Sequence, residues 1–331
     1  MLLLGASAQA ADCLRPQDDF FLISARSIGG SWCADAWQRV SCHRYVTVEG
    51  ESSRRWISVP IEEFLAGGDA SQLTLVYVHG NRVRPGEDVA ETLSVYRTLI
   101  ACAPHAPPIR LVAFSWPTER AAGPLHDYRM KAELADPTGL QLASILSRLP
   151  GDTRLALVGY SYGTRVIGGA LQLLAGGTLC GYQLAEPANL GPVRVLLISA
   201  AVHNDWLLPG RPHGMAMHVV DRLVLINNAC DPAMRFYHFS SRRGHPDALG
   251  RWGVAGPALL GESGGRIIAF DACRQVGKRH ALQYYLGAAS LMHAASQQIL
   301  PPETPPLEYA RNDRLPEWTL GSASRAGHPG G

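Results

Sequence analysis

Hydrophobic residues in this chain gather in short continuous runs, and the stretches between the runs change in character along the sequence. Apolar runs at 20–24, 44–48 and 56–59 predict three strands that precede any convincing helix, so we expect an antiparallel start. From residue 73 onward, apolar runs alternate with helix-like stretches. Alternation at this length is typical of right-handed crossovers, and it predicts a mostly parallel sheet with helices on both faces.

The later apolar runs are almost free of polar residues, as buried parallel strands usually are. They predict strands at 73–78, 109–114, 155–158, 193–198, 223–226 and 266–270. Helices are predicted at 87–101, 125–149 with a possible break at Pro137, 164–175 and 282–298. Reactive groups of such sheets collect where the parallel strands end, so the loops after these strands are the first places to search for chemistry.

Composition narrows the class of protein. The chain has 331 residues, of which 47% are hydrophobic and 18% charged, with a formal net charge of +2. This excludes a disordered or fibrous protein, and it provides no basic field that would attract nucleic acid. No apolar run approaches the roughly 18 residues that a membrane span needs. We expect one globular domain over 11–300, and the oligomeric state stays open.

The two ends of the chain have a different character. Ala8-Gln9-Ala10 follows an apolar stretch and fits a signal-peptidase site, so residues 1–10 are interpreted as a truncated signal peptide, although no Lys or Arg precedes that stretch. We therefore expect export to the periplasm or the medium, with a cytoplasmic location as the alternative. The Pro-rich stretch that begins at Pro301 predicts a loosely ordered tail over 301–331.

The strongest chemical signal is Gly159-Tyr160-Ser161-Tyr162-Gly163, a Gly-x-Ser-x-Gly pattern. It lies between the strand at 155–158 and the helix at 164–175, which is the strand–turn–helix setting that a nucleophilic serine of this kind requires. A very sharp turn would lift the Ser161 hydroxyl above the sheet, and glycines would relieve collisions with the neighbouring strand and helix. The alternative is a Gly-rich turn with a capping serine.

This motif, together with Val78-His79-Gly80-Asn81 and Phe114-Ser115-Trp116-Pro117, resembles the α/β-hydrolase superfamily, in particular its bacterial esterase/lipase-like members. The resemblance extends from about residue 73 to residue 298. It implies an α/β-hydrolase fold, with a mostly parallel central sheet, an antiparallel N-terminal start and helices on both faces. It also implies that the catalytic residues follow one another as serine, acid and histidine.

A serine hydroxyl needs a base, and the base needs an orienting carboxylate. His280 follows the last predicted strand, as the order requires, whereas the other late histidines precede that strand or fall in the final helix and tail: His238, His245, His293 and His328. A surface histidine at a helix start is the alternative. For the acid we favour Asp231, on the loop after the strand at 223–226, over its rivals Asp205 and Asp271; helix capping before Pro232 is its non-catalytic alternative.

Backbone N–H groups should stabilise the oxyanion of the tetrahedral intermediate. Tyr162 directly follows the nucleophile and is one expected donor. The resemblance assigns the other to Asn81, which could instead use its side chain or only hold the loop. His79 and Gly80 are expected to shape this turn. His79 precedes Ser161, so it has the wrong order for the base.

Seven cysteines also favour export, because an exported protein can pair six of them. Cys33 and Cys42 flank a predicted hairpin, and Cys230 and Cys273 lie near the two proposed catalytic loops. We therefore propose these two pairs, with seven buried thiols as the alternative. The absence of Cys-x-x-Cys argues against a zinc ribbon.

The sequence thus predicts a serine hydrolase that cleaves a small-molecule carboxylic ester through an acyl-enzyme on Ser161. An amidase, an acyltransferase or a catalytically silent binding protein could share the same framework. We expect no cofactor and no metal, because the chain lacks a phosphate-binding Gly-x-x-x-x-Gly-Lys-Ser/Thr pattern and His-Glu-x-x-His. Trp116 and Trp206 are candidates to line an acyl pocket, and the segment 238–265 is a candidate flap or substrate wall.

Overall fold

The computed structural model describes residues 14–300 except 48–53, 69–70, 186–187, 192 and 241–244. The predicted signal peptide (1–10) and tail (301–331) therefore lie outside the described residues. So do residues 241–244 of the candidate flap.

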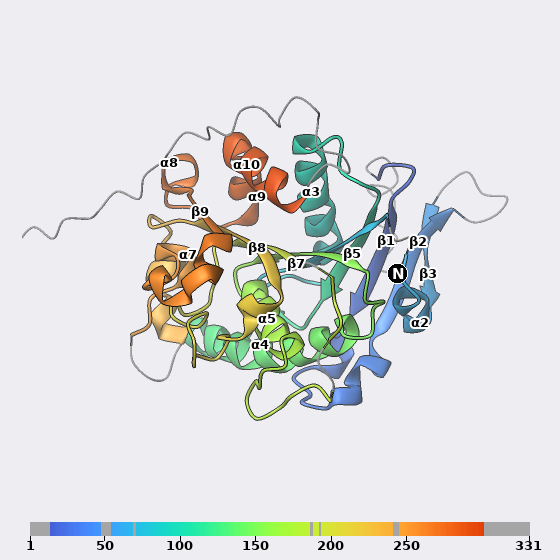
Figure 1. Cartoon of the computed structure of the whole chain (residues 1–331), viewed down its shortest axis with the longest axis horizontal. Coiled ribbons are helices and arrows are strands. Elements are labelled where there is room, and N and C mark those ends of the chain that lie inside the picture. Colours follow the sequence, from blue (N-terminus) through green and yellow to red (C-terminus); the bar gives the residue numbers. More distant parts are fainter. Residues whose placement is uncertain are drawn as a thin grey trace, which may run out of the picture.

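Within the described residues the strands form a single sheet in the order β3-β2-β1-β5-β4-β6-β7-β8-β9 (Figure 1). The pairs β1–β2 and β2–β3 are antiparallel, and every other neighbouring pair is parallel. This is the predicted α/β-hydrolase fold, a mostly parallel sheet with antiparallel pairing at its N-terminal edge. The strands are β1 (Asp19–Ser24), β2 (Ser41–Thr47), β3 (Arg54–Val59), β4 (Leu73–Val78), β5 (Ile109–Ser115), β6 (Arg154–Tyr160), β7 (Val193–Ile198), β8 (Val220–Asn227) and β9 (Ile267–Asp271).

Helices cover both faces of the sheet, as Figure 1 shows. On one face α4 (Pro124–Leu146) and α5 (Gly163–Leu174) pack into one hydrophobic cluster, and on the other face α3 (Glu87–Cys102), α9 (Leu282–Leu286) and α10 (Ala289–Ile299) pack into a second. Successive residues of a strand point to opposite faces, so Val76 and Tyr77 of β4 enter different clusters. Continuous apolar runs are needed because both faces of these strands are buried.

Short elements complete the described chain. They are η1 (Arg26–Ile28), η2 (Ala34–Arg39), α2 (Ile61–Leu65), η3 (Ala216–His218), α6 (Pro232–Arg235), η4 (Tyr237–Ser240), α7 (Leu249–Trp252), η5 (Pro257–Arg266) and α8 (Cys273–Val276). None of the helices in the described ranges is long and apolar enough to cross a membrane.

Three sequence predictions differ from the structure. Helix α4 continues through Pro137 without a break. The single helix predicted at 282–298 is two helices, because the chain leaves helical geometry at Ala288, whose ψ is 78°. The hairpin predicted between Cys33 and Cys42 is wrong, since the segment forms the 3₁₀ helix η2. It leaves Cys33 exposed and Cys42 buried on β2, and both are free thiols.

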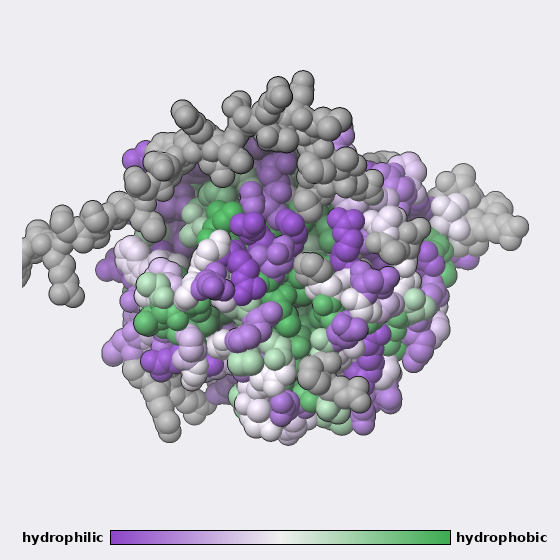
Figure 2. Space-filling view, in the orientation of Figure 1, coloured by the Kyte–Doolittle hydropathy of each residue, from purple (hydrophilic) through white to green (hydrophobic). Residues whose placement is uncertain are grey.

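The segment proposed as a flap or substrate wall contributes exposed hydrophobic side chains. Figure 2 shows hydrophobic surface on the left, over α7 and the turns that follow it. Trp252 and Leu259 of this segment are 57% and 68% exposed. Beneath them, Gly250 donates its N–H to the Ala200 carbonyl and accepts from Asn228, so the backbone of α7 is attached to the carboxyl ends of the central strands.

Candidate active site

Ser161 stands at the turn from β6 into α5 with a φ of 51°, in the left-handed region that residues other than glycine seldom occupy. Its N–H donates to the Ile198 carbonyl at 3.0 Å, and its own carbonyl accepts from the Ala201 N–H at 3.2 Å. The end of β7 therefore fixes the strained turn from both sides. Strain of this kind persists only where surrounding contacts hold it, and it is common at reactive positions.

Glycine is needed beside Ser161 for steric reasons. A Cβ atom at Gly163 would overlap the Val78 carbonyl oxygen, and one at Gly159 would come within 3.1 Å of the Thr164 backbone. Gly80, on the loop after β4, approaches equally closely, since its Cβ would lie 3.1 Å from Ser161 Cβ. The loop after β4 and the serine turn thus pack directly on each other.

The three side chains predicted from chain order lie in one row. Ser161 Oγ is 3.2 Å from His280 Nε2, and His280 Nδ1 is 2.7 Å from Asp231 Oδ2. His280 is placed by the loop between α8 and α9, and Asp231 by the loop after β8. The rival acids lie elsewhere: Asp205 pairs with Arg211 at 3.4 Å, and Asp271 accepts from the Cys273 N–H at 2.9 Å.

Asp231 is fully buried, and both of its carboxyl oxygens accept hydrogen bonds. One carboxyl oxygen accepts from the Ala233 N–H at 2.8 Å, which caps α6, so the capping alternative and the contact with His280 both occur. The other oxygen accepts from Ser199 Oγ at 2.9 Å and from Tyr285 OH at 3.1 Å, besides facing His280. Burial alone would raise the pKa of Asp231, but these hydrogen bonds, with that of His280 foremost, bring its pKa below the ordinary value.

Sequence reasoning missed Ser199 and Tyr285. Ser199 also has a positive φ of 47°, and its Oγ lies 3.4 Å from His280 Nδ1. A usable signal existed for Ser199, which directly follows the predicted strand at 193–198, at the edge where reactive groups collect. Tyr285 carried no such signal, because its contact with Asp231 depends on the separate placement of α9.

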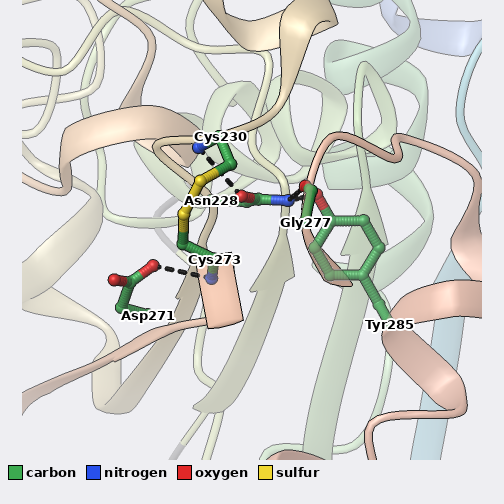
Figure 3. The surroundings of a disulfide bond; sticks show 6 residues. All are labelled: Asn228, Cys230, Asp271, Cys273, Gly277 and Tyr285. Atoms are coloured by element: carbon green, nitrogen blue, oxygen red, sulfur yellow. Dashed lines mark hydrogen bonds between the residues drawn. A yellow bond between two sulfur atoms is a disulfide. The ribbon is translucent and has the colours of Figure 1, made fainter. Parts of the chain in front are cut away.

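A disulfide joins the acid loop to the base segment, as proposed (Figure 3). Cys230 is bonded to Cys273, with 5.3 Å between their Cα atoms. Beside it, buried Asn228 accepts from the Cys230 N–H at 3.0 Å and donates to the Gly277 carbonyl at 2.9 Å. The loops that carry Asp231 and His280 are therefore tied by a covalent bond and a buried amide. The expectation of six paired cysteines is not met, because four described cysteines are free: Cys33, Cys42, Cys102 and Cys180.

Both candidates for the oxyanion hole, Asn81 and Tyr162, line the pocket that contains Ser161. The Asn81 side chain serves its own loop: Nδ2 donates to Asp127 Oδ2 at 3.0 Å and Oδ1 accepts from the Arg82 N–H at 2.8 Å. Asp127 is buried at the start of α4 and also accepts from Arg82 Nε at 2.9 Å. These bonds hold the loop, and they leave the backbone of Asn81 as the group to consider for the oxyanion.

His79 is fully buried beneath this loop. Its Nδ1 lies 2.9 Å from the Gly80 carbonyl, and its Nε2 accepts from the Trp116 N–H at 3.2 Å. Burial lowers the pKa of His79 to about 4, so the ring is neutral near pH 7. A neutral ring that donates through Nδ1 and accepts through Nε2 fits this packing role.

The pocket over Ser161 is small, about 120 Å³. Its apolar walls are Tyr128, Ala201, Ala233, Met234, Phe236 and Tyr237. The two tryptophans proposed for this pocket are placed elsewhere. Trp116 is fully buried and donates from Nε1 to the His79 carbonyl at 2.9 Å, and Trp206 packs on the rings of His203 and His213.

Within the described ranges, no group of three or more His, Cys, Asp and Glu side chains is arranged to hold a metal ion.

No family model matches the sequence, and no curated protein matches it. Among solved structures, acyl-protein thioesterase 2 of Zea mays is similar at 15% identity and a TM-score of 0.35, over 70% of this chain and 96% of that one. The catalytic core of Trichoderma reesei acetyl xylan esterase is similar at 14% identity and 0.34, over 69% and 100%. Trichoderma reesei cutinase is similar at 12% identity and 0.32, over 70% and 77%. The fold is described from the strand order of the chain itself.

Proposed function

We propose that this protein is a serine hydrolase that cleaves carboxylic esters through an acyl-enzyme on Ser161. The observation that carries the proposal is the hydrogen-bonded row of Ser161, His280 and Asp231, with heavy-atom distances of 3.2 and 2.7 Å. We propose further that it belongs to the bacterial esterase/lipase-like group, which the Val-His-Gly-Asn and Phe-Ser-Trp-Pro motifs resemble.

In this mechanism Ser161 Oγ attacks the ester carbonyl carbon while His280 Nε2 takes the hydroxyl proton. The backbone N–H groups of Tyr162 and Asn81 stabilise the negative oxygen that results. His280 then gives its proton to the alcohol oxygen, and the carbon–oxygen bond to the alcohol breaks. Water attacks the acyl-enzyme, passes one proton to His280, and the proton returns to Ser161 as the acid leaves.

Asp231 acts through His280 in this scheme. A buried carboxylate at Nδ1 holds the imidazole with Nε2 toward the serine and stabilises the imidazolium that forms. The lowered pKa of Asp231 keeps it ionised near pH 7, which this role requires.

The test is hydrolysis of p-nitrophenyl acetate by the parent protein and by Ser161→Ala. We expect kcat to fall by about 10⁴-fold or more, since removal of a triad member leaves only binding and oxyanion stabilisation. Ser290→Ala, a change at an exposed serine on α10, is the matched control and should retain parental activity.

A parent protein without hydrolysis would favour the silent binding protein. Faster acyl transfer to an added alcohol or amine than to water would favour the acyltransferase, and preferential cleavage of a matched amide would favour the amidase.

We also propose that the protein is exported, as a single domain over 11–300. The Cys230–Cys273 disulfide supports export, because such bonds persist mainly in oxidising compartments. Fractionation of expressing cells should place the mature protein outside the cytoplasm, and recovery of the full chain in the cytoplasm would support the alternative location.

A further inference from the structure

A second and larger cleft borders His280 on the side of α3 and α9, two helices that lie side by side in Figure 1. Its volume is about 540 Å³, against about 120 Å³ for the pocket over Ser161. Both spaces share the walls Asn81, Arg82, Tyr160 and His280. Ser161 and Tyr162 line the smaller pocket and are not among the side chains that line the cleft.

In the proposed mechanism the acyl part and the alcohol part of an ester occupy different spaces. The acyl carbon becomes bonded to Ser161 Oγ, so the acyl group must lie in the pocket that contains Ser161. The leaving oxygen receives its proton from His280 Nε2, so it must lie within hydrogen-bonding distance of that atom. His280 borders both spaces, so with the acyl group in the pocket over Ser161 the cleft is the remaining space next to His280 into which the alcohol can extend.

The walls of the cleft are rich in hydrogen-bond acceptors. Glu91 of α3 accepts from Tyr77 OH at 2.9 Å through one oxygen, and its second oxygen can accept from a ligand. Ser94 donates its hydroxyl to the Ala90 carbonyl at 2.9 Å, so its lone pairs can accept as well. Gln283 of α9 adds an exposed amide on the opposite wall. Acceptors in this arrangement suit a ligand with several hydroxyl groups.

Two charged side chains in the walls of the cleft, Arg82 and Glu87, already form ion pairs. Arg82 contacts Asp127 at 2.9 Å, and Glu87 contacts Arg84. Burial raises the pKa of Glu91 to about 7, so near neutral pH this carboxyl is only partly charged. The walls therefore favour neither a strongly anionic nor a strongly cationic group.

We propose that the cleft between α3 and α9 is the leaving-group subsite, and that it takes an uncharged polyhydroxy alcohol of roughly the size of a monosaccharide. The volume lies in the usual range of about 300–1,000 Å³ for small-molecule sites. This inference rests on the proposed esterase function, because it takes His280 as the group that protonates the leaving oxygen.

The test compares acetyl esters that share the acyl group and differ in the alcohol: 6-O-acetylglucose, ethyl acetate and acetylcholine. We expect kcat/KM to be at least about tenfold higher for the glucose ester than for either of the others, because only the glucose ester fills the cleft with neutral hydroxyl groups. Equal values for glucose ester and ethyl acetate would overturn the subsite, and the highest value for acetylcholine would show a cation subsite instead.

Variants locate the effect in the cleft. Glu91→Gln should raise KM for the glucose ester about fivefold at pH 8 and lower the ratio of glucose-ester to ethyl-acetate kcat/KM, because one acceptor oxygen is lost. Glu62→Gln, the same change at an exposed position on α2, should keep both constants at parental values. A Glu91→Gln variant that lowers activity on both esters equally would make Glu91 structural and contradict the assignment.

The outcomes also separate the two proposals. Hydrolysis of p-nitrophenyl acetate without preference for the glucose ester would overturn the subsite alone. No hydrolysis of any ester by the folded parent protein would overturn both the subsite and the proposed function.

Discussion

Two regions meet at the candidate active site, and they are built in different ways. The serine turn, residues 159–163, is held by backbone contacts alone: steric crowding against the end of β4 and hydrogen bonds to the end of β7. The base–acid arm, residues 228–231 and 273–285, joins side chains 49 residues apart through a disulfide and a cluster of polar contacts. Backbone contacts thus hold Ser161, whereas His280 is held by a side-chain hydrogen bond and by a segment that a disulfide ties to the Asp231 loop.

The largest expected effect tests the acid of the arm. Asp231→Asn should lower kcat on p-nitrophenyl acetate by about 10³–10⁴-fold, because the amide cannot hold the imidazole in the required tautomer. Circular dichroism should verify that the variant is folded. Asp205→Asn, which changes the rival acid paired with Arg211, should leave kcat within about twofold. If Asp205→Asn lost its activity and Asp231→Asn kept it, the acid would be Asp205 and not Asp231.

The sharp turn at Ser161 could be predicted from the sequence for a physical reason. A strand, two glycines and a helix within a few residues leave few backbone paths, so local sterics determine the position of Ser161. Asp231 and His280 were found through chain order, which the superfamily resemblance supplied. Ser199 was missed although it directly follows a predicted strand, whereas the contact of Tyr285 and the separation of Cys33 from Cys42 depend on the short helices α9 and η2, which the sequence pattern did not predict as separate elements.

The next prediction tests whether steric crowding at the serine turn requires glycine at residue 163. Gly163→Ala should lower the free energy of unfolding by about 3 kcal/mol, because its Cβ would overlap the Val78 carbonyl oxygen, which is backbone and cannot rotate away. Urea denaturation measures the change. Gly265→Ala, at a glycine with open space around its Cβ position, should shift the free energy by less than about 0.5 kcal/mol. Similar losses in both variants would refute the steric account.

A smaller effect is expected from the covalent link of the arm. The double variant Cys230→Ser/Cys273→Ser should lose about 2–4 kcal/mol of stability, because the disulfide no longer closes a loop between residues 43 apart and the unfolded chain gains conformational entropy. Cys102→Ser, at a free and half-buried thiol, should change stability by less than about 1 kcal/mol. A reducing agent should destabilise the parent and leave the double variant unaffected; sensitivity of both to reduction would show that another bond is responsible.

The smallest effect is the dependence of the arm on pH. A carboxyl whose pKa is lowered in the folded state stabilises the fold above its unfolded pKa, and this contribution is lost as pH falls through the folded value. For Asp231 the loss begins near the ordinary value of 3.8 and continues below it. Urea midpoints of the parent and Asp231→Asn should therefore differ by a constant amount down to about pH 5 and converge between about pH 5 and pH 2. A constant difference over this range would mean that Asp231 ionisation does not stabilise the arm.

The most direct measurement is the site of a covalent adduct. A fluorophosphonate reacts with a serine only where an adjacent base and an oxyanion hole activate it. Peptide mapping of the labelled parent should find one phosphonyl group on Ser161, with labelling slowed by orders of magnitude in a folded His280→Ala variant. A parent protein that stays unlabelled, or that carries the adduct on another residue, would contradict the assignment of Ser161 as an activated nucleophile.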